Sequence, residues 1–164
     1  MMRKNQRGVG MVEVLVSLVI LSIAVLGYAV LQIRALEASL EASNNIQAMN
    51  IARDLAERMR MNREGISEYK PLKSDAEVED CATDFCSPLA LAQFDYSNVQ
   101  QRAAQLGMSI NVLACPESVL SRMCVYVAWD ETRPVDGQEK DTCTNGVAYQ
   151  PNAKCVIMEA LNDL

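Results

Sequence analysis

The chain has 164 residues, of which 15 are Lys or Arg and 21 are Asp or Glu, so its formal net charge is −6. No basic patch with interleaved aromatic residues is present, and an acidic protein is poorly suited to non-specific nucleic-acid binding. The length allows one modest domain with an extended element. Aromatic residues make up 5% of the chain and histidine is absent, which predicts a small aliphatic core and excludes Ser-His or Cys-His nucleophiles.

An uncharged apolar run, Val14–Ile33, follows a basic stub and one acidic residue, Glu13. As a helix these 20 residues span about 30 Å, the thickness of a bilayer core. The stub carries Arg3, Lys4 and Arg7, and this bias places the N-terminus in the cytoplasm and the body outside. Because a carboxylate at the edge of hydrocarbon is costly, we expect Glu13 to have a function.

Three interpretations of this segment compete. A cleaved secretory signal is disfavoured because the apolar run is too long and no clear small-residue cleavage site follows it. A plain signal anchor explains the topology but gives no reason for Glu13. The third interpretation is a class III signal, which is cut on the cytoplasmic side so that the helix stays in the mature protein.

The stretch Arg7–Val16 resembles the type IV prepilin signal, which joins a short basic leader, a Gly, a hydrophobic residue, a Glu and a long apolar helix. The resemblance implies that a prepilin peptidase cuts between Gly8 and Val9 and methylates the new N-terminus. Val9 stands where the family usually has Phe. It also implies that Glu13 is an assembly residue that pairs with the N-terminus of a neighbouring subunit. Both charges would be costly in an apolar bundle unless they are paired.

The helix is expected to continue beyond the membrane, from Val12 to about Asn62, because the only Gly in its interior after Gly10 is Gly27 and there is no Pro. A helix of ~50 residues is about 75 Å long. Its second half is amphipathic, and Gly65 is a candidate helix stop. The apolar positions expected to face a domain are Ile33, Leu36, Leu40, Ile46, Met49, Leu55 and Met59.

The rest of the chain predicts a small head. A connector to about Pro88 leads to a helix, Leu89–Leu106, ended by Gly107. We expect the apolar side of this helix to hold Leu91, Phe94, Val99, Ala103 and Leu106. Alternating patterns predict three strands, at Met108–Cys115, Met123–Trp129 and Lys154–Ala160, with a long loop over Asp130–Ala153. The fold class is α+β, in which the long N-terminal helix packs on a small antiparallel sheet, as in the type IV pilin fold that the resemblance implies.

All six cysteines lie beyond residue 80: Cys81, Cys86, Cys115, Cys124, Cys143 and Cys155. An even number on one side of an anchor indicates an oxidising compartment and disulfides. A zinc site is the competing interpretation, but no Cys-x-x-Cys pair is present. Our hypothesis joins near neighbours, as Cys81–Cys86, Cys115–Cys124 and Cys143–Cys155.

A second resemblance concerns the end of the long helix. The run Asn50–Asn62 and the strand Cys124–Trp129 are similar to those of PilV-type minor pilins, also called type IV pilus modification proteins. Many members have a Trp in the middle helix and a Leu-Pro pair after it, and this chain has neither. Two interpretations of the charged residues in the run stay open. In one, the arginines complement the helix dipole, which leaves Glu57 unexplained. In the other, Asp54, Glu57, Arg58 and Arg60 fix the helix to the following loop.

These patterns give a domain organisation of a leader peptide at 1–8, a transmembrane and filament-core helix at 9–33, an amphipathic helix at 34–63 and a head at 64–164. The resemblance implies a minor pilin that acts in initiation or assembly of a type IV pilus, in adhesion and in twitching motility. The head would be periplasmic on a single-pass inner-membrane anchor, and later part of the pilus at the cell surface. The implied partners are other minor pilins, the major pilin, the prepilin peptidase and the inner-membrane assembly platform, with a tip adhesin as a further candidate.

Two alternatives remain. A minor pseudopilin of a type II secretion system would have the same N-terminus. A membrane-anchored enzyme or ligand-binding module has little support, because no Gly-rich phosphate loop or positioned acid–base pair is present. We therefore expect no enzymatic activity, cofactor, metal or nucleic-acid partner. The acidic run at 75–80 is typical of a solvated loop, and calcium binding there stays open although the EF-hand spacing is missing.

Overall fold

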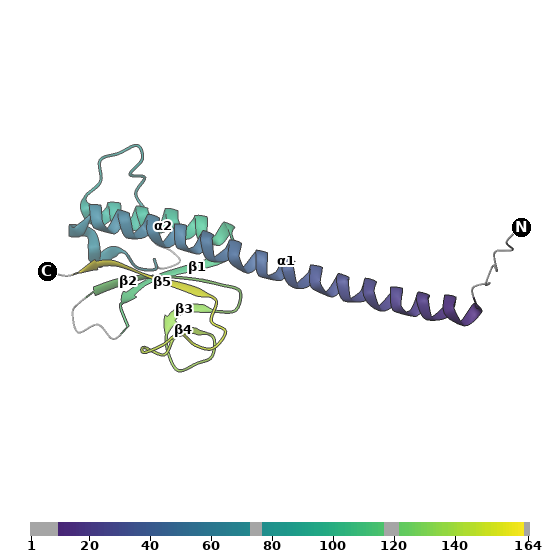
Figure 1. Ribbon diagram of the computed structural model, residues 1–164. Helices are drawn as coiled ribbons and strands as arrows, with labels where there is room; N and C mark the ends of the chain where they lie inside the picture. The colour runs from purple at the N-terminus through teal and green to yellow at the C-terminus, as the bar shows by residue number, and fades with distance from the viewer. Residues whose placement is uncertain (1–9, 73–76, 117–121, 163–164) are drawn as a thin grey trace, which may run out of the picture. The chain divides into compact units, whose positions relative to one another are not determined.

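The computed structural model describes residues 10–72, 77–116 and 122–162. The first of these ranges contains a long helix, α1 (Met11–Met61), and a short 3₁₀ helix, η1 (Arg63–Glu68). The second contains the helix α2 (Pro88–Gln105), and five strands follow this helix along the chain (Figure 1). Contacts divide the chain into two compact units, one up to Ala42 and one from Ser43 onward.

The long helix is continuous over 51 residues, which corresponds to about 75 Å at 1.5 Å per residue. Glu13 lies in its first turn and Arg58 and Arg60 lie in its last. These charges complement the partial positive and negative charges of the two helix ends. The prediction of one helix from Val12 to about Asn62 is confirmed within one residue at each end.

The buried stripe of α1 differs from the predicted one. Of the seven predicted positions only Leu55 and Met59 are buried, and Ile46 and Met49 are exposed. The buried residues of the helix are Ala48, Ile51, Ala52, Leu55, Ala56 and Met59. Three of these six are alanines, whose small side chains let neighbouring backbones approach closely. Hydrophobicity alone selects the larger residues, so the sequence pattern found Leu55 and Met59 but missed the three alanines.

The second helix, α2, lies where a helix was predicted. Ser87 caps its N-terminus by accepting a hydrogen bond from the Ala90 N–H at 3.2 Å, and Pro88 occupies the first turn. Gly107 follows its end with a φ of +70°, a backbone conformation that glycine adopts without strain. The buried face is formed by Ala92, Asp95, Tyr96, Val99 and Ala103. The predicted apolar side was therefore right at Val99 and Ala103, whereas Leu106 is exposed.

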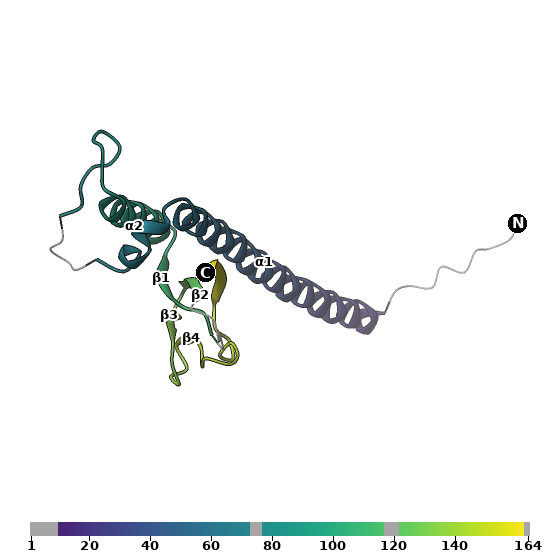
Figure 2. The ribbon, with the colours of Figure 1, turned by 90° about the vertical axis from the view of Figure 1, so that its left-hand side faces the viewer.

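Three antiparallel strands form the main sheet in the order β1 (Met108–Ala114), β2 (Arg122–Trp129) and β5 (Cys155–Asn162). The three predicted strands are confirmed. The central strand β2 is buried on both faces. Its odd-numbered residues join α1 and α2 in the larger core, whereas Cys124, Tyr126 and Ala128 form a second cluster with Cys143 and Cys155. Figure 2 shows the two helices on one side of this sheet and the segment between β2 and β5 on the other.

The predicted loop over Asp130–Ala153 is only partly a loop. It contains two short parallel strands, β3 (Arg133–Asp136) and β4 (Thr142–Thr144). Strands of four and three residues are too short to show alternation in the sequence. The Tyr126 hydroxyl donates to the Asp136 carboxylate at 3.1 Å, so β3 is attached to the face of β2 that carries Tyr126.

Three disulfides staple this part of the chain: Cys81–Cys86, Cys115–Cys124 and Cys143–Cys155. They have the near-neighbour arrangement of our hypothesis. A cross-link of this kind contributes about 2–3 kcal/mol by restricting the unfolded chain, which matters in a domain with a small core.

Gly65 has a different role from the predicted one. The helix α1 ends at Met61, and Gly65 lies buried inside η1. A Cβ atom at this position would clash with the Pro88 carbonyl oxygen and would lie 2.6 Å from Asn62 Nδ2 and 2.9 Å from the Ala92 Cβ. Gly65 is therefore required for the close approach of η1 to the start of α2.

We expect Gly65→Ala to lower the free energy of unfolding of the head by about 1–3 kcal/mol, because backbone must move to admit the methyl group. Trp129 is the only tryptophan and is buried in the larger core, so its fluorescence during denaturant unfolding of the detergent-solubilised full chain measures this stability. Gly27→Ala is the control, since nothing lies within 4 Å of its added Cβ. Equal stability of the two variants would contradict the packing role of Gly65.

Candidate functional site

The first turn of α1 carries a lone carboxylate at the start of the apolar run. The Glu13 backbone N–H donates to the Gly10 carbonyl at 2.9 Å, and the Glu13 carbonyl accepts a hydrogen bond from the Ser17 hydroxyl at 2.7 Å. Both bonds use the backbone, and Glu13 is exposed. The carboxylate is thus positioned by the helix and accessible to a partner. The predicted processing residues Gly8 and Val9 lie outside the described residues.

The apolar run itself is exposed along its whole length, and residues 10–40 include no buried position. The hydroxyls of Ser17 and Ser22 each donate to the carbonyl four residues earlier, at 2.7 and 2.8 Å. The polar side chains of these two serines therefore have internal partners and tolerate an apolar environment. Of the described residues, α1 is the helix long and apolar enough to cross a membrane. A continuous apolar surface of this size requires lipid or other helices to cover it.

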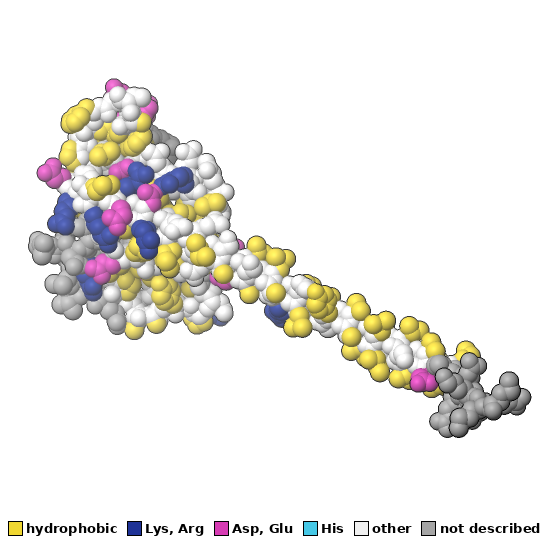
Figure 3. Space-filling view, turned by 45° about the horizontal axis from the view of Figure 1, so that its top comes forward, with side chains coloured by type: hydrophobic (Ala, Val, Ile, Leu, Met, Phe, Trp, Pro, Cys, Tyr) yellow, Lys and Arg dark blue, Asp and Glu magenta, His cyan; other side chains and the backbone are white. Residues whose placement is uncertain are grey.

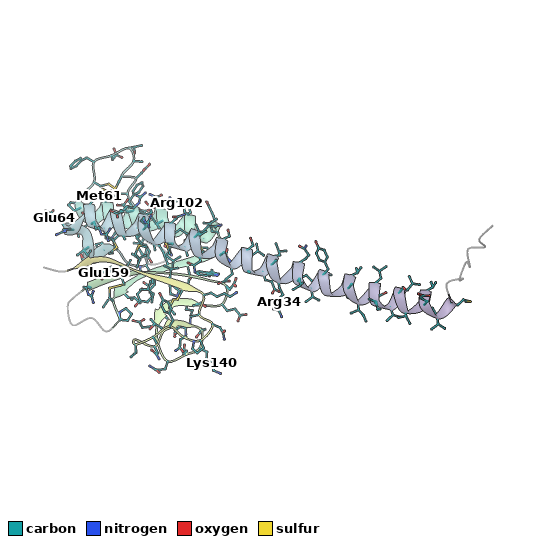
Figure 4. The ribbon with its side chains drawn as sticks, in the orientation of Figure 1. Arg34, Met61, Glu64, Arg102, Lys140 and Glu159 are labelled. Atoms are coloured by element: carbon teal, nitrogen blue, oxygen red, sulfur yellow. A yellow bond between two sulfur atoms is a disulfide. The ribbon has the colours of Figure 1, made fainter. Side chains whose placement is uncertain are left out.

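In the head, a charged cluster joins α1 to α2. Arg58 Nη1 donates to Asp95 Oδ1 at 2.5 Å, and Arg58 Nε donates to Asp54 Oδ1 at 3.1 Å. Asp54 also forms an ion pair with Arg102 of α2 (Figure 4). The Asp95 side chain is only 10% exposed. A carboxylate at such depth is tolerated because it is paired and hydrogen-bonded.

Tyr69, just after η1, completes the surroundings of Asp95. Its hydroxyl lies 3.2 Å both from the Asp95 carboxylate and from the Arg58 carbonyl. Burial raises the pKa of Tyr69, and the negative charge of Asp95 raises it further. The hydroxyl therefore keeps its proton and acts as a hydrogen-bond donor. Asn62 adds a second link, since its side-chain amide donates to the Pro88 carbonyl at 2.7 Å.

Arg60 connects the same helix end to the sheet. Its Nε donates to the Ala160 carbonyl at 2.9 Å and its Nη2 to the Glu159 carbonyl at 3.3 Å. Both carbonyls belong to β5, an edge strand of the sheet (Figure 4). Arg60 also pairs with Glu57 at 2.7 Å. A side chain that occupies edge carbonyls in this way leaves fewer of them open to another strand.

The charged run at the end of α1 thus has more than a dipole role. Two interpretations were left open, and the contacts favour attachment. The attachment is mainly to α2 and β5, although Tyr69 brings in the following loop as predicted. Sequence reasoning missed Asp95 and Arg102. The signal for Asp95 was a charged residue among the small and apolar positions of one helix face, at Ala92, Tyr96 and Val99.

No arrangement typical of catalysis is found in the described residues. An open depression of about 470 Å³ is lined by Asp130, Glu131, Thr132, Asn152 and Lys154. Asp130 is already paired with Lys154 at 2.6 Å, so it is not a free general base. In the described part of the chain, no three Cys, Asp or Glu residues are grouped as metal ligands. Asp75, part of the acidic run considered for calcium, lies outside that part.

We expect Arg58→Ala to destabilise the head by about 2–3 kcal/mol, because it leaves the Asp95 carboxylate buried without its cation. The loss is set below the 3–5 kcal/mol typical of a fully buried pair, since the Arg58 side chain is 31% exposed. Trp129 fluorescence during unfolding of the full chain in detergent measures the change.

Arg53→Ala serves as the matched control for Arg58→Ala. Arg53 lies on the same helix and is exposed, so its loss is expected to change stability by less than about 0.5 kcal/mol. The double variant Arg58→Ala/Asp95→Asn should lose less unfolding free energy than the two single variants lose together, because the two residues contact each other. If Arg58→Ala lowers the free energy of unfolding no more than Arg53→Ala does, the prediction is wrong and Arg58 belongs to a solvated face.

Comparison with known proteins adds two family matches. Residues 3–29 match the prokaryotic N-terminal methylation motif, and residues 30–97 match a family described as Type IV pilin Tt1218. No curated protein and no solved structure was found to match the chain. The two matches adjoin, cover more than half of the chain and accord with its long N-terminal helix on a small antiparallel sheet stapled by disulfides. The chain is therefore similar to type IV pilins over residues 30–97 and carries the N-terminal methylation motif over residues 3–29.

Proposed function

We propose that the chain is a minor pilin of the PilV type that takes part in initiating or assembling a type IV pilus. The observation that carries the proposal is the order of the two matches, a methylation motif followed directly by a pilin region. A pilin family is structural and not enzymatic. The matches support a membrane-anchored protein of a pilus, and we propose in addition that it is a minor pilin of the PilV subfamily.

Support for the PilV assignment comes from the end of α1. The run Asn50–Asn62 carries the resemblance, and its charged residues contact α2 and β5. These contacts give the run a physical reason to have its residue types, because Asp54, Glu57, Arg58 and Arg60 each meet a partner of opposite sign. The same run is the feature that separates this proposal from a minor pseudopilin of a secretion system.

In our proposal residues 1–8 are a leader that a prepilin peptidase removes between Gly8 and Val9, and the new N-terminus at Val9 is methylated. Residues 9–33 then form the membrane and filament-core helix, 34–63 its amphipathic continuation and 64–164 the head. The basic leader places the N-terminus in the cytoplasm and the head in the periplasm. Assembly then carries the head to the cell surface.

Removal of the leader puts Glu13 five positions into the mature chain. A packed bundle of apolar helices excludes water, so a free ammonium and a carboxylate are each costly there unless they pair. Glu13 of an incoming subunit would satisfy the N-terminal ammonium of its neighbour and fix the register of the two helices. The partners proposed for this step are other minor pilins and the major pilin, on the inner-membrane assembly platform. A tip adhesin is a further proposed partner.

The processing step predicts the mass of the mature protein. Mass spectrometry of the chain from piliated cells should give a mature form that begins at N-methylated Val9. Gly8→Asp should leave the leader attached, because a cleavage site shaped for a residue without a side chain excludes a carboxylate. Gly10→Ala, two residues away, should be processed normally. A full-length chain in otherwise processed pili would contradict the proposal.

The pairing of Glu13 predicts an assembly defect. Breaking a buried ion pair costs about 3–5 kcal/mol, and about 1.4 kcal/mol is a factor of ten. Glu13→Ala should therefore reduce the amount of the chain in sheared pili at least about tenfold, while its amount in the membrane stays the same. Immunoblots of the pilus and membrane fractions measure both.

Ser17→Ala is the matched control for Glu13→Ala. Ser17 lies one turn further along the same helix and is also exposed, but it carries no charge. We expect this variant to enter pili like the native chain. Unchanged incorporation of Glu13→Ala would overturn the assembly role of Glu13.

A further inference from the structure

One aromatic side chain is unexplained by the fold. Phe85 is fully exposed, although the chain has only two phenylalanines and the other, Phe94, is half-buried on α2. Leaving a Phe side chain in water forgoes about 1.5–3 kcal/mol of burial. Phe85 lies in residues 77–87, which we name the Phe85 loop. Along the chain this loop comes between η1 and α2, and it is at the top of Figure 1.

The Phe85 loop is held in place from both sides of Phe85. The Cys81–Cys86 disulfide closes it, with the two Cα atoms 5.5 Å apart. Inside the loop Asp80 caps a turn: its side chain accepts from the Ala82 N–H at 3.1 Å, and its carbonyl accepts from the Asp84 N–H at 3.2 Å. Directly after Cys86, Ser87 caps α2. A ring on so constrained a backbone loses little conformational entropy on binding.

The charge of the Phe85 loop is of one sign. Four carboxylates lie in it, on Glu77, Glu79, Asp80 and Asp84, and the sequence has no Lys or Arg from Ser74 to Gln101. Within the described residues, none of these carboxylates forms an ion pair with Lys or Arg. Figure 3 shows hydrophobic and acidic side chains on this loop, whereas the Lys and Arg side chains visible there lie over the helices.

The exposed Phe85 ring and the four carboxylates of the loop together indicate the chemistry of the partner. Anionic lipid headgroups and nucleic-acid phosphates are repelled by the four carboxylates. A second copy of the chain is disfavoured for the same reason, since without Met1–Gly8 there are 12 basic and 21 acidic residues, a net charge of −9. What fits is a protein surface with an apolar pocket for the ring and Lys or Arg at its rim.

We propose that the Phe85 loop is a docking knob for the head of a different pilin subunit, which receives Phe85 in an apolar pocket rimmed by basic residues. The inference rests on the proposed function, which brings heads of several pilins together. Phe85 is the anchor of the contact, and the carboxylates on Glu79 and Asp84 steer the approach. Aromatic anchors with a polar rim carry most of the binding free energy in protein interfaces.

Photo-crosslinking in piliated cells tests this, with the full chain carrying p-benzoylphenylalanine at one position. Phe85→p-benzoylphenylalanine should give at least about fivefold more adduct than the same residue at Val147. Val147 is exposed and lies in another loop of the head. Mass spectrometry should place the adduct on the head of another pilin, at a site that includes Lys or Arg.

A charge variant tests the electrostatic part. Glu79→Gln/Asp84→Asn should lower the adduct from position 85 at least about threefold, because two carboxylates near the ring are lost. Glu64→Gln is the matched control, an exposed carboxylate on η1 (Figure 4), and should leave the yield unchanged. Equal yields from the two variants would show that the partner site is not basic and would overturn the proposal.

A third position separates this inference from the proposed function. Leu21→p-benzoylphenylalanine, on the exposed apolar helix, should crosslink to neighbouring pilins if the chain enters filaments. Adducts from Leu21 without an excess from Phe85 overturn the docking knob and leave the minor pilin assignment intact. An adduct from Phe85 on lipid, on nucleic acid or on a second copy of this chain also overturns it. No pilin adduct from either position overturns both proposals.

Discussion

A buried carboxylate holds the head together. Asp95 lies on the covered face of α2, where only pairing makes an ionised group tolerable. Arg58 supplies the charge from α1, and Tyr69 supplies a further hydrogen bond from the segment between the helices. One side chain therefore fixes three separate parts of the chain against each other. Because the hydrophobic core is small and rich in alanine, this directional contact defines a packing that apolar burial alone would leave loose.

The helix α1 serves two different environments with one backbone. Up to Ala42 its apolar side chains are exposed, and beyond Ser43 its buried stripe is short and built largely from alanine. The change is not one of helix propensity, since no proline interrupts the helix and its hydrogen bonding continues to Met61. What differs between the two halves is the surroundings that must cover the apolar side chains. Large apolar residues suit lipid or packed helices, whereas small ones suit close contact with a folded head.

Sequence reasoning was accurate where a periodic pattern is long and local. It gave the ends of α1 within one residue and located α2 and three strands, because helices and alternating strands record their environment every few residues. It was only partly right for the buried faces of the two helices, since Ala48 and Ala92 carry little hydrophobic signal although both are fully buried. Asp95 and Arg102 could not be assigned from sequence because their partners, Arg58 and Asp54, are at least 37 residues away. Strands β3 and β4 depend on contacts with β2 and leave no local signal.

The charges of the head divide into a set that is paired between its elements and a loop that carries only anions. Arg58 and Arg102 are paired with Asp95 and Asp54, and Arg60 is occupied by Glu57 and the carbonyls of β5. The Phe85 loop keeps its carboxylates unpaired among the described residues. An approaching protein therefore meets negative charge on this loop, beside an exposed ring. Apolar contact along the helix is non-directional and similar for every neighbour, so discrimination between partners must come from surfaces of this kind on the head.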